Sequence, residues 1–144
     1  MDADSIDPYI KEFDKWNEKA KELNAVPFNE YFHEREIWWC ALGVNIGSEQ
    51  DGKNESFERP VIIIKKIRHD LVFIVPVTTK IGDYPDRISA IIAGQESQIL
   101  ISQARTISSR RLLRGIGRVK VSIYQSVIIG LIKMILPKKS ETPH

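Results

Sequence analysis

The sequence has one cysteine and no long apolar segment. Cys40 cannot form an internal disulfide and has no second thiol for a metal site, so we expect it to pack as a small hydrophobic residue. The apolar segment at 127–136 is interrupted by Gly130 and Lys133 and is too short to cross a bilayer. Residues 1–4 do not begin a basic and then apolar signal region, so we predict a cytoplasmic protein without a membrane span.

Several catalytic motifs are also missing. The sequence has no glycine-rich phosphate loop ending in Lys-Ser/Thr, no His/Cys/carboxylate cluster with zinc spacing, and no Gly-x-Ser-x-Gly turn. Its three histidines, His33, His69 and His144, lie in a linker, a hairpin turn and the C-terminal position, where we expect them to be solvated. We therefore predict no metal ion and no cofactor. The remaining Arg, Glu, Gln, Ser and Thr side chains suit phosphodiester chemistry on RNA, in which the substrate supplies its own 2′-hydroxyl nucleophile.

Length and charge describe a single small globular chain with uneven charge. The 144 residues are 42% hydrophobic and 28% charged, which is typical of a folded domain. Residues 1–36 contain ten acidic and five basic residues, whereas residues 37–144 contain nine acidic and sixteen basic ones. Six basic residues and no acidic residue lie between Arg105 and Lys120. This block either contacts phosphates or forms a solvated surface.

The spacing of apolar residues predicts a helix at each end of the chain. Residues from about Ser5 to Asn24 have one apolar stripe, with Ser5 or Asp7 as the cap, and this face should pack on the body of the protein or on a partner. A second helix is predicted from a Ser122 cap to about Leu136. Its expected buried stripe consists of Val127, Ile128, Leu131, Ile132 and Ile135.

Between these helices the pattern is that of short strands. Strands are predicted at 37–42, 61–64, 71–77, 87–93, 97–102 and 113–121, with a polar loop at 43–58 and a short helical turn at 108–112. Such a meander favours a mainly β (α+β) fold, a small, strongly bent antiparallel barrel. We predict an N-terminal helical extension at 1–34 and a barrel domain with a C-terminal helix at 35–144.

Five segments, in a fixed order, resemble the MazF/PemK family of toxins over about residues 35–136. These segments are Arg35-Glu36-Ile37-Trp38-Trp39, Gly47-Ser48-Glu49-Gln50, Arg59-Pro60-Val61-Ile62-Ile63, Val75-Pro76-Val77-Thr78-Thr79, and Ser102-Gln103-Ala104-Arg105-Thr106-Ile107 with Arg111-Leu112. The resemblance implies an SH3-like barrel of the MazF/PemK/CcdB type, usually a homodimer. It also implies the toxin of a type II toxin–antitoxin system, a metal-independent endoribonuclease that cuts single-stranded RNA at short sequences and is neutralised by a protein antitoxin.

The same resemblance implies a catalytic pair, Arg59 and Thr78. Arg59 would stabilise charge on the scissile phosphate, because an arginine of ordinary pKa is a poor base. Thr78 would bond to a phosphate oxygen or to the attacking hydroxyl. Further RNA-binding residues would be Ser48, Glu49, Gln50, Thr79, Lys80, Gln103 and Arg105.

Some of these roles have alternatives. Glu49 would be either a general base or an ion-pair partner of Arg59. Gln103 and Arg105 would either line the RNA groove or stabilise the barrel, with a structural salt bridge slightly favoured for Arg105. A different function is a non-catalytic barrel that binds a protein, as CcdB does with gyrase.

The sequence departs from the family pattern in two places. Eight residues, 51–58, separate Gln50 from Arg59, where the usual number is about three, so we expect the loop to contact or cover the groove differently. The N-terminal helix lies outside the resemblance. We expect this helix to pack on the barrel or at a dimer interface, with antitoxin contact as a weaker alternative.

Overall fold

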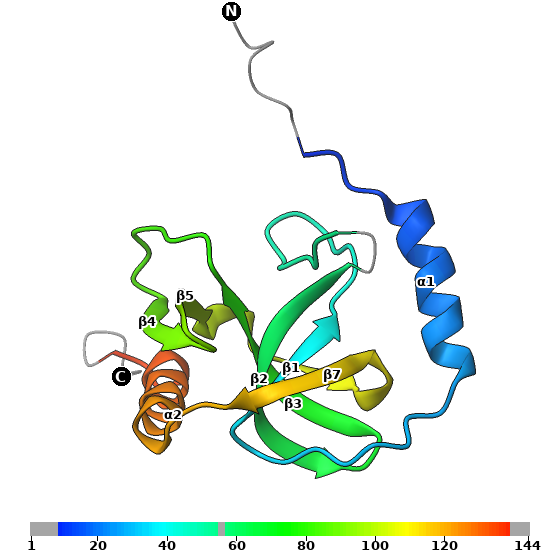
Figure 1. Ribbon diagram of the computed structural model, residues 1–144. Helices are drawn as coiled ribbons and strands as arrows, with labels where there is room; N and C mark the ends of the chain where they lie inside the picture. Colours follow the sequence, from blue (N-terminus) through cyan, green and yellow to red (C-terminus); the bar gives the residue numbers. More distant parts are fainter. Residues whose placement is uncertain (1–8, 55–56, 139–144) are drawn as a thin grey trace, which may run out of the picture.

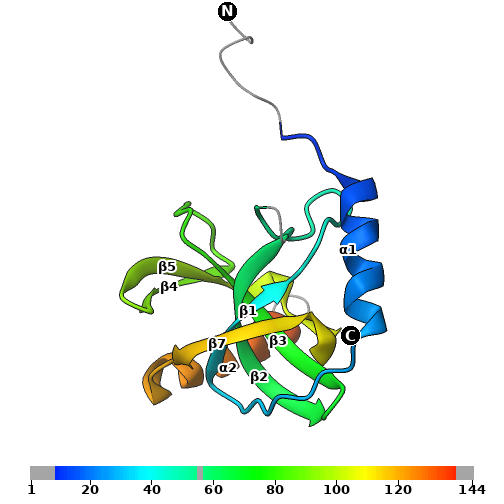
Figure 2. The same cartoon turned by 45° about the vertical axis from the view of Figure 1, so that its right-hand side comes forward.

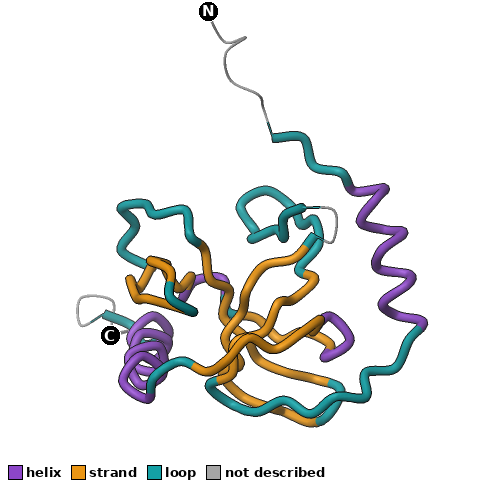
Figure 3. The backbone as a smooth tube through the Cα atoms, in the orientation of Figure 1, coloured by secondary structure: helices purple, strands orange, loops and turns teal. Residues whose placement is uncertain are grey.

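A computed structural model describes residues 9–54 and 57–138 (Figure 1). The chain is mainly β with one α-helix near each end, as Figure 3 shows. The helices are α1 (Phe13–Ala25) and α2 (Val121–Ile135), with two short 3-10 turns, η2 (Ile101–Gln103) and η3 (Ser109–Arg111). The strands are β1 (Glu36–Ala41), β2 (Glu58–Arg68), β3 (Leu71–Thr78), β4 (Arg87–Ile92), β5 (Gln95–Leu100), β6 (Arg105–Ser108) and β7 (Leu112–Arg118).

The seven strands form one twisted antiparallel sheet. The strand order is β4-β5-β3-β2-β1-β7, and β6 pairs with the other end of β3. Within the described residues, β4 and β7 are not paired with each other, so the curled sheet is open. Figure 2 shows the β4–β5 hairpin extending from the strongly twisted β2 and β3. The predicted mainly β antiparallel architecture with two helices is confirmed.

The centre of the sheet is buried on both faces. Val61 and Ile63 of β2 pack into one core cluster with Trp38, Cys40 and other residues of β1, β3 and β6. Ile62 and Ile64 point to the opposite face. There they join a second cluster that includes Val127 and Leu131 of α2. This two-sided burial explains the nearly continuous apolar sequence of β2, and Cys40 is fully buried as expected.

Several predicted boundaries were wrong. Strand β2 covers 58–68 and is longer at both ends than the predicted 61–64, and β6 was not predicted. The residue before α2 is Lys120, not Ser122, and it provides no side-chain cap. The N–H of Val119 donates to the carbonyl of Arg35, which holds the chain extended just before the helix. Ile132 and Ile135 are 51% and 74% exposed, because α2 is buried only at Val127 and Leu131.

Helix α1 begins at Phe13, later than predicted. Residues 9–12 are not helical, and the two proposed caps, Ser5 and Asp7, lie outside the described residues. The residue before α1 is Glu12, without a side-chain cap bond. Trp16 is the main contact of α1 with the body of the protein, because its ring lies against Gly43 and meets Phe57 edge to face at 5.7 Å. Of the two expected partners for this face, the structure shows the body of the protein.

The long loop between β1 and β2 contains a small hairpin. Lys53 and Glu58 exchange main-chain hydrogen bonds of 2.9 and 2.8 Å, and the buried Phe57 lies inside this turn. Gly52 allows the turn to close, since a Cβ there would lie 1.6 Å from the carbonyl oxygen of Phe57. This turn places Phe57 against the Trp16 ring.

In the described part of the chain, no helix has the length and apolar character needed to cross a membrane.

Candidate functional site

A pocket of about 750 Å³ opens where β2 begins and β3 ends. Arg59 and Thr78 both line it. The strand register pairs Val61 with Pro76, so the two polar residues sit at adjoining ends of neighbouring strands. Other lining residues come from the loop before β2, the segment after β3, the start of β4 and the segment before α1. They include Glu49, Gln50, Asp51, Lys80, Arg87, Tyr9 and Lys11.

Arg59 is 6% exposed and is held by main-chain oxygens. Its Nε donates to the carbonyl of Asp51 at 2.8 Å, and Nη1 donates to the carbonyl of Val77 at 3.5 Å. Burial lowers the pKa of the guanidinium, while the charge of Asp51 acts in the opposite direction. An arginine remains charged in proteins, so the site holds a desolvated cation in fixed orientation.

Thr78 is also 6% exposed and lines the same pocket. Its Oγ1 accepts a hydrogen bond of 3.1 Å from the N–H of Lys80. Because that bond uses the oxygen as an acceptor, the hydroxyl hydrogen can be donated to a ligand. A buried guanidinium and a hydroxyl donor in one pocket are suited to binding an anion.

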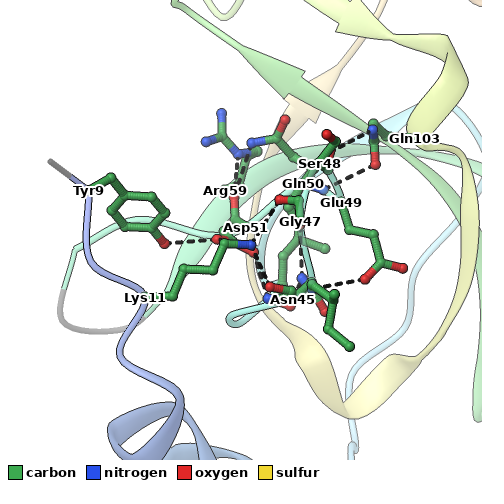
Figure 4. A network of polar contacts seen from close by, with 12 residues as sticks. Tyr9, Lys11, Asn45, Gly47, Ser48, Glu49, Gln50, Asp51, Arg59 and Gln103 are labelled. Atoms are coloured by element: carbon green, nitrogen blue, oxygen red, sulfur yellow. Dashed lines mark hydrogen bonds and ion pairs between the residues drawn. The ribbon is translucent and has the colours of Figure 1, made fainter.

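Asp51 organises the loop in front of Arg59 (Figure 4). Its carboxylate is buried and accepts bonds from the N–H of Asn45 at 2.6 Å and from the hydroxyl of Tyr9 at 2.8 Å. Lys11 Nζ lies 3.3 Å from the same carboxylate and also donates to the carbonyls of Asn45 and Gly47. The residues before α1 thus fix the loop whose main chain orients Arg59.

Gln103 holds the same loop from the other side. Its Oε1 accepts from the N–H of Gln50 at 3.0 Å, and its Nε2 donates to the carbonyl of Ser48 at 3.2 Å. The carboxylate of Glu49 accepts from the N–H of Ile46 at 2.9 Å, and no ion pair between Glu49 and Arg59 forms. Of the two alternatives for Glu49, the ion pair with Arg59 is therefore wrong, and the general base stays a prediction.

The predicted RNA-binding residues are divided among three neighbouring pockets. Glu49, Gln50 and Lys80 line the Arg59 pocket. Ser48, Gln103 and Arg105 line a second pocket of about 540 Å³, which also includes Glu49 and Gln50. Thr79 lines a third pocket of about 300 Å³ with Arg59 and Trp39. In the residues that are described, no carboxylate pairs with Arg105, so the structural salt bridge is not observed.

The basic block between Arg105 and Lys120 is partly used within the protein. Arg111 donates to the carbonyls of Ala41 and Leu42, and Arg114 forms two bonds with Glu58 at 2.9 and 3.2 Å. Arg110 donates to the carbonyl of Asn24. These three arginines therefore join elements of the fold, and the block is not one solvated surface.

Among the lining residues of the Arg59 pocket that sequence reasoning missed are Asp51, Tyr9, Lys11 and Arg87. Asp51 directly follows the Gly-Ser-Glu-Gln motif, and that position was the available signal. Tyr9 and Lys11 precede α1 and lie at the pocket only because the chain folds back over the loop. No local pattern marks such a contact. Among residues 9–54 and 57–138, no group of three His, Cys, Asp or Glu side chains could hold a metal ion.

Comparisons with known proteins agree with this architecture. Residues 33–135 match a family described as PemK-like, MazF-like toxin of type II toxin–antitoxin system. No curated protein sequence matches the chain.

Similar solved structures include MazF from Deinococcus radiodurans, at 18% identity and a TM-score of 0.60 over 74% of this chain and 98% of that one. An endoribonuclease in complex with its cognate antitoxin, from a mycobacterial species, has 15% identity and a TM-score of 0.57 over 75% and 99%. A MazE–MazF structure from D. radiodurans has 16% identity and a TM-score of 0.55 over 74% and 97%. At these identities the likeness shows a shared fold.

Proposed function

Since the chain belongs to the PemK-like, MazF-like toxin family of type II toxin–antitoxin systems, we propose that it is an endoribonuclease acting on single-stranded RNA in the cytoplasm. The observation that carries this proposal is the placement of Arg59 and Thr78, both buried and both lining one pocket. Lys80 and Arg87 on the same pocket wall add positive charge for the RNA backbone.

The proposed reaction is an internal transfer of the phosphodiester. The 2′-oxygen of the substrate attacks the adjacent phosphorus, a 2′-O–P bond forms, and the P–O5′ bond breaks. The products are a 2′,3′-cyclic phosphate and a 5′-hydroxyl, so the proton lost from the 2′-hydroxyl is balanced by the proton gained at O5′. The reaction consumes no water and requires no covalent bond to the protein.

Arg59 stabilises the negative charge that builds on the phosphate oxygens during this step. The guanidinium is desolvated and already oriented by the Asp51 carbonyl, so little reorganisation is needed as charge develops. Thr78 donates its hydroxyl hydrogen to a phosphate oxygen or orients the attacking 2′-hydroxyl. The Glu49 carboxylate caps a turn at Ile46, so we assign it to loop structure and not to the general base.

The decisive experiment is digestion of a long single-stranded RNA with the purified protein in EDTA. We expect discrete fragments with 5′-hydroxyl ends, and resistance of an RNA with a 2′-deoxynucleotide at the cut position. Arg59→Ala should reduce cleavage on the order of 100- to 1,000-fold, as loss of one charge-stabilising donor does in other enzymes.

Arg68→Ala is the matched control. Arg68 lies on the same strand, its side chain is 66% exposed, and its ion pair with Asp70 is far along β2 from the pocket. This variant should cleave at the wild-type rate. Intact RNA after incubation with the wild-type protein, together with stable capture of a protein target, would instead support the non-catalytic function.

We further propose two protein partners. The first is a cognate antitoxin, supported by family membership and by related folds solved in complex with antitoxins. The second is another copy of this chain. The apolar side chains Ile129, Ile132 and Ile135 of α2 and Leu136 just after it are each more than half exposed, and a homodimer contact would cover them.

A further inference from the structure

Tyr9 lies in the Arg59 pocket although it is outside the part of the chain that matches the family. The match covers 33–135, whereas Tyr9 belongs to the non-helical segment before α1. Tyr9 is nevertheless a lining residue of the pocket that contains Arg59 and Thr78. In Figure 4 its ring lies beside Asp51, with the hydroxyl directed at the Asp51 carboxylate. This chain therefore has a pocket wall that the matched family segment does not supply.

The Tyr9 side chain is exposed but held in place. It is 67% exposed, and its hydroxyl donates to Oδ2 of Asp51 at 2.8 Å. The Asp51 carboxylate is itself buried. It accepts a hydrogen bond from the N–H of Asn45 and forms an ion pair with Lys11. Burial, together with the bond to Asp51, raises the pKa of Tyr9 to about 12, so the hydroxyl remains a donor at neutral pH. The ring is thus held by a buried anchor while much of its surface remains open.

Lys11 makes this arrangement compatible with an anionic ligand. An unpaired Asp51 carboxylate beside the pocket would repel a phosphodiester. Lys11 lies 3.3 Å from that carboxylate and holds the carbonyls of Asn45 and Gly47. Lys11 therefore both neutralises the charge of Asp51 and attaches the segment before α1 to the loop.

An exposed, immobilised aromatic ring in such a pocket is suited to stacking with a nucleotide base. Sequence-specific proteins recognise single-stranded RNA by splaying its bases out and stacking them on aromatic side chains. A ring that is already held loses little conformational freedom when a base binds. The same pocket has Lys80 and Arg87, which can contact the phosphates of the stacked nucleotide.

On the premise of the proposed endoribonuclease function, we propose that Tyr9 is a substrate-binding residue on which one base of the RNA stacks, and that it sets the nucleotide preference at that position. The competing interpretation is a plug, in which the segment at Tyr9 blocks the pocket. The two differ in the sign of their effect, because removing a plug accelerates cleavage and removing a stacking ring slows it.

The test uses a randomised single-stranded RNA pool digested in EDTA, with the 5′-hydroxyl ends sequenced, and four proteins: wild type, Tyr9→Leu, Tyr9→Phe and Tyr31→Leu. Tyr9→Leu should broaden the preference at one nucleotide of the cut sequence. It should also lower kcat/KM on the preferred sequence on the order of five- to 100-fold, the equivalent of one lost stacking contact. Tyr9→Phe keeps the ring and should keep the preference, even if the lost anchor lowers the rate.

Tyr31→Leu is the matched control, because Tyr31 is 79% exposed and lies beside His69, outside the Arg59 pocket. It should match wild type in preference and rate, and thermal unfolding of all four proteins should show equal folding. Wild-type preference and rate in Tyr9→Leu, or faster cleavage, would overturn the inference while leaving the proposed function intact. A wild-type protein that leaves the pool uncut would overturn both.

Discussion

Arg59 Nε lies 2.8 Å from the main-chain oxygen of Asp51, and this hydrogen bond joins the start of β2 to the loop in front of it. The carboxylate of the same Asp51 is bound by Tyr9 and Lys11 from the segment before α1. Asp51 thus links the Arg59 guanidinium, through its main chain, to Tyr9 and Lys11, through its side chain. Changes at any of these contacts should therefore reach Arg59.

Arg59→Lys tests whether orientation matters beyond charge. Lysine keeps the positive charge but loses the planar fork that donates to the Asp51 carbonyl while lining the pocket. We expect kcat/KM for RNA cleavage to fall on the order of 100-fold, with the thermal midpoint nearly unchanged. Arg68→Lys on the same strand is the control. Full activity in Arg59→Lys would show that a point charge is sufficient.

The contact between Trp16 and Phe57 should stabilise the protein. Their rings meet edge to face at 5.7 Å, the geometry favoured by aromatic pairs. In a double-mutant cycle with Trp16→Ala and Phe57→Ala, followed by urea unfolding, we expect a coupling free energy of about 0.5–1.5 kcal/mol. A cycle of Phe13→Ala with Phe57→Ala should give no coupling, since Phe13 is 49% exposed. Additive effects of Trp16 and Phe57 would argue against this contact.

Gly43 and Gly47 allow backbone strain to be separated from steric conflict. Both have positive φ, +81° and +55°, but a Cβ at Gly43 would lie 2.1 Å from the Trp16 ring, whereas one at Gly47 meets nothing within 4 Å. We expect Gly47→Ala to cost about 1–2 kcal/mol of unfolding free energy. Gly43→Ala should lower the unfolding free energy by more than Gly47→Ala does. In a protein that also carries Trp16→Ala, this additional loss should disappear, because the clashing ring is gone. Equal costs in both backgrounds would contradict the predicted clash.

The Glu58–Arg114 pair should make stability depend on pH in the acid range. The bond from Arg114 lowers the pKa of Glu58 below its ordinary 4.5. A depressed carboxyl pKa contributes stability above the unfolded value, and that contribution disappears as pH falls through the folded pKa. Glu58→Gln should therefore be less stable than wild type at pH 7, and the difference should shrink toward pH 3. A difference that grows on acidification would reverse the assignment.

The exposed face of α2 should set the oligomeric state. Ile132 and Ile135 are 51% and 74% exposed, so replacing both with Asp removes apolar surface without opening the core. We expect the doubly substituted protein to be monomeric and folded under conditions in which wild type is a dimer by light scattering. Gln125→Asp with Ser126→Asp, on exposed polar positions of the same helix, is the control. A wild-type monomer at all concentrations would contradict the proposed homodimer.

The predictable parts of the fold were those fixed by local patterns. The β-branched residues around Ile62 and Val75 identified two central strands, and the motif around Arg59 and Thr78 located a pocket that the fold forms at those strand ends. The proposed boundary between an extension and a barrel domain near residue 34 stays a prediction.

The errors arose where distant contacts overrode local preference. Tyr9 suits a helical stripe, yet its hydroxyl binds Asp51 and its segment is not helical. Ser122 is a good capping residue, but the residue before α2 is Lys120, two positions earlier, next to the bond between Val119 and Arg35. The stripe through Ile132 and Ile135 was read as buried because an apolar face exposed to solvent has the same spacing as one in a core.

The Trp16–Phe57 contact has a consequence for how this chain can differ from its relatives. Helix α1 without Phe57 would lose the aromatic partner of Trp16, and the turn closed by Lys53 and Glu58 without that helix would expose Phe57. The helix that bears Trp16 and the turn that bears Phe57 therefore depend on each other. Grafted together onto a shorter relative with a glycine at the Gly43 position, they should bring Tyr9 and Lys11 to that protein's pocket; grafted singly, neither should.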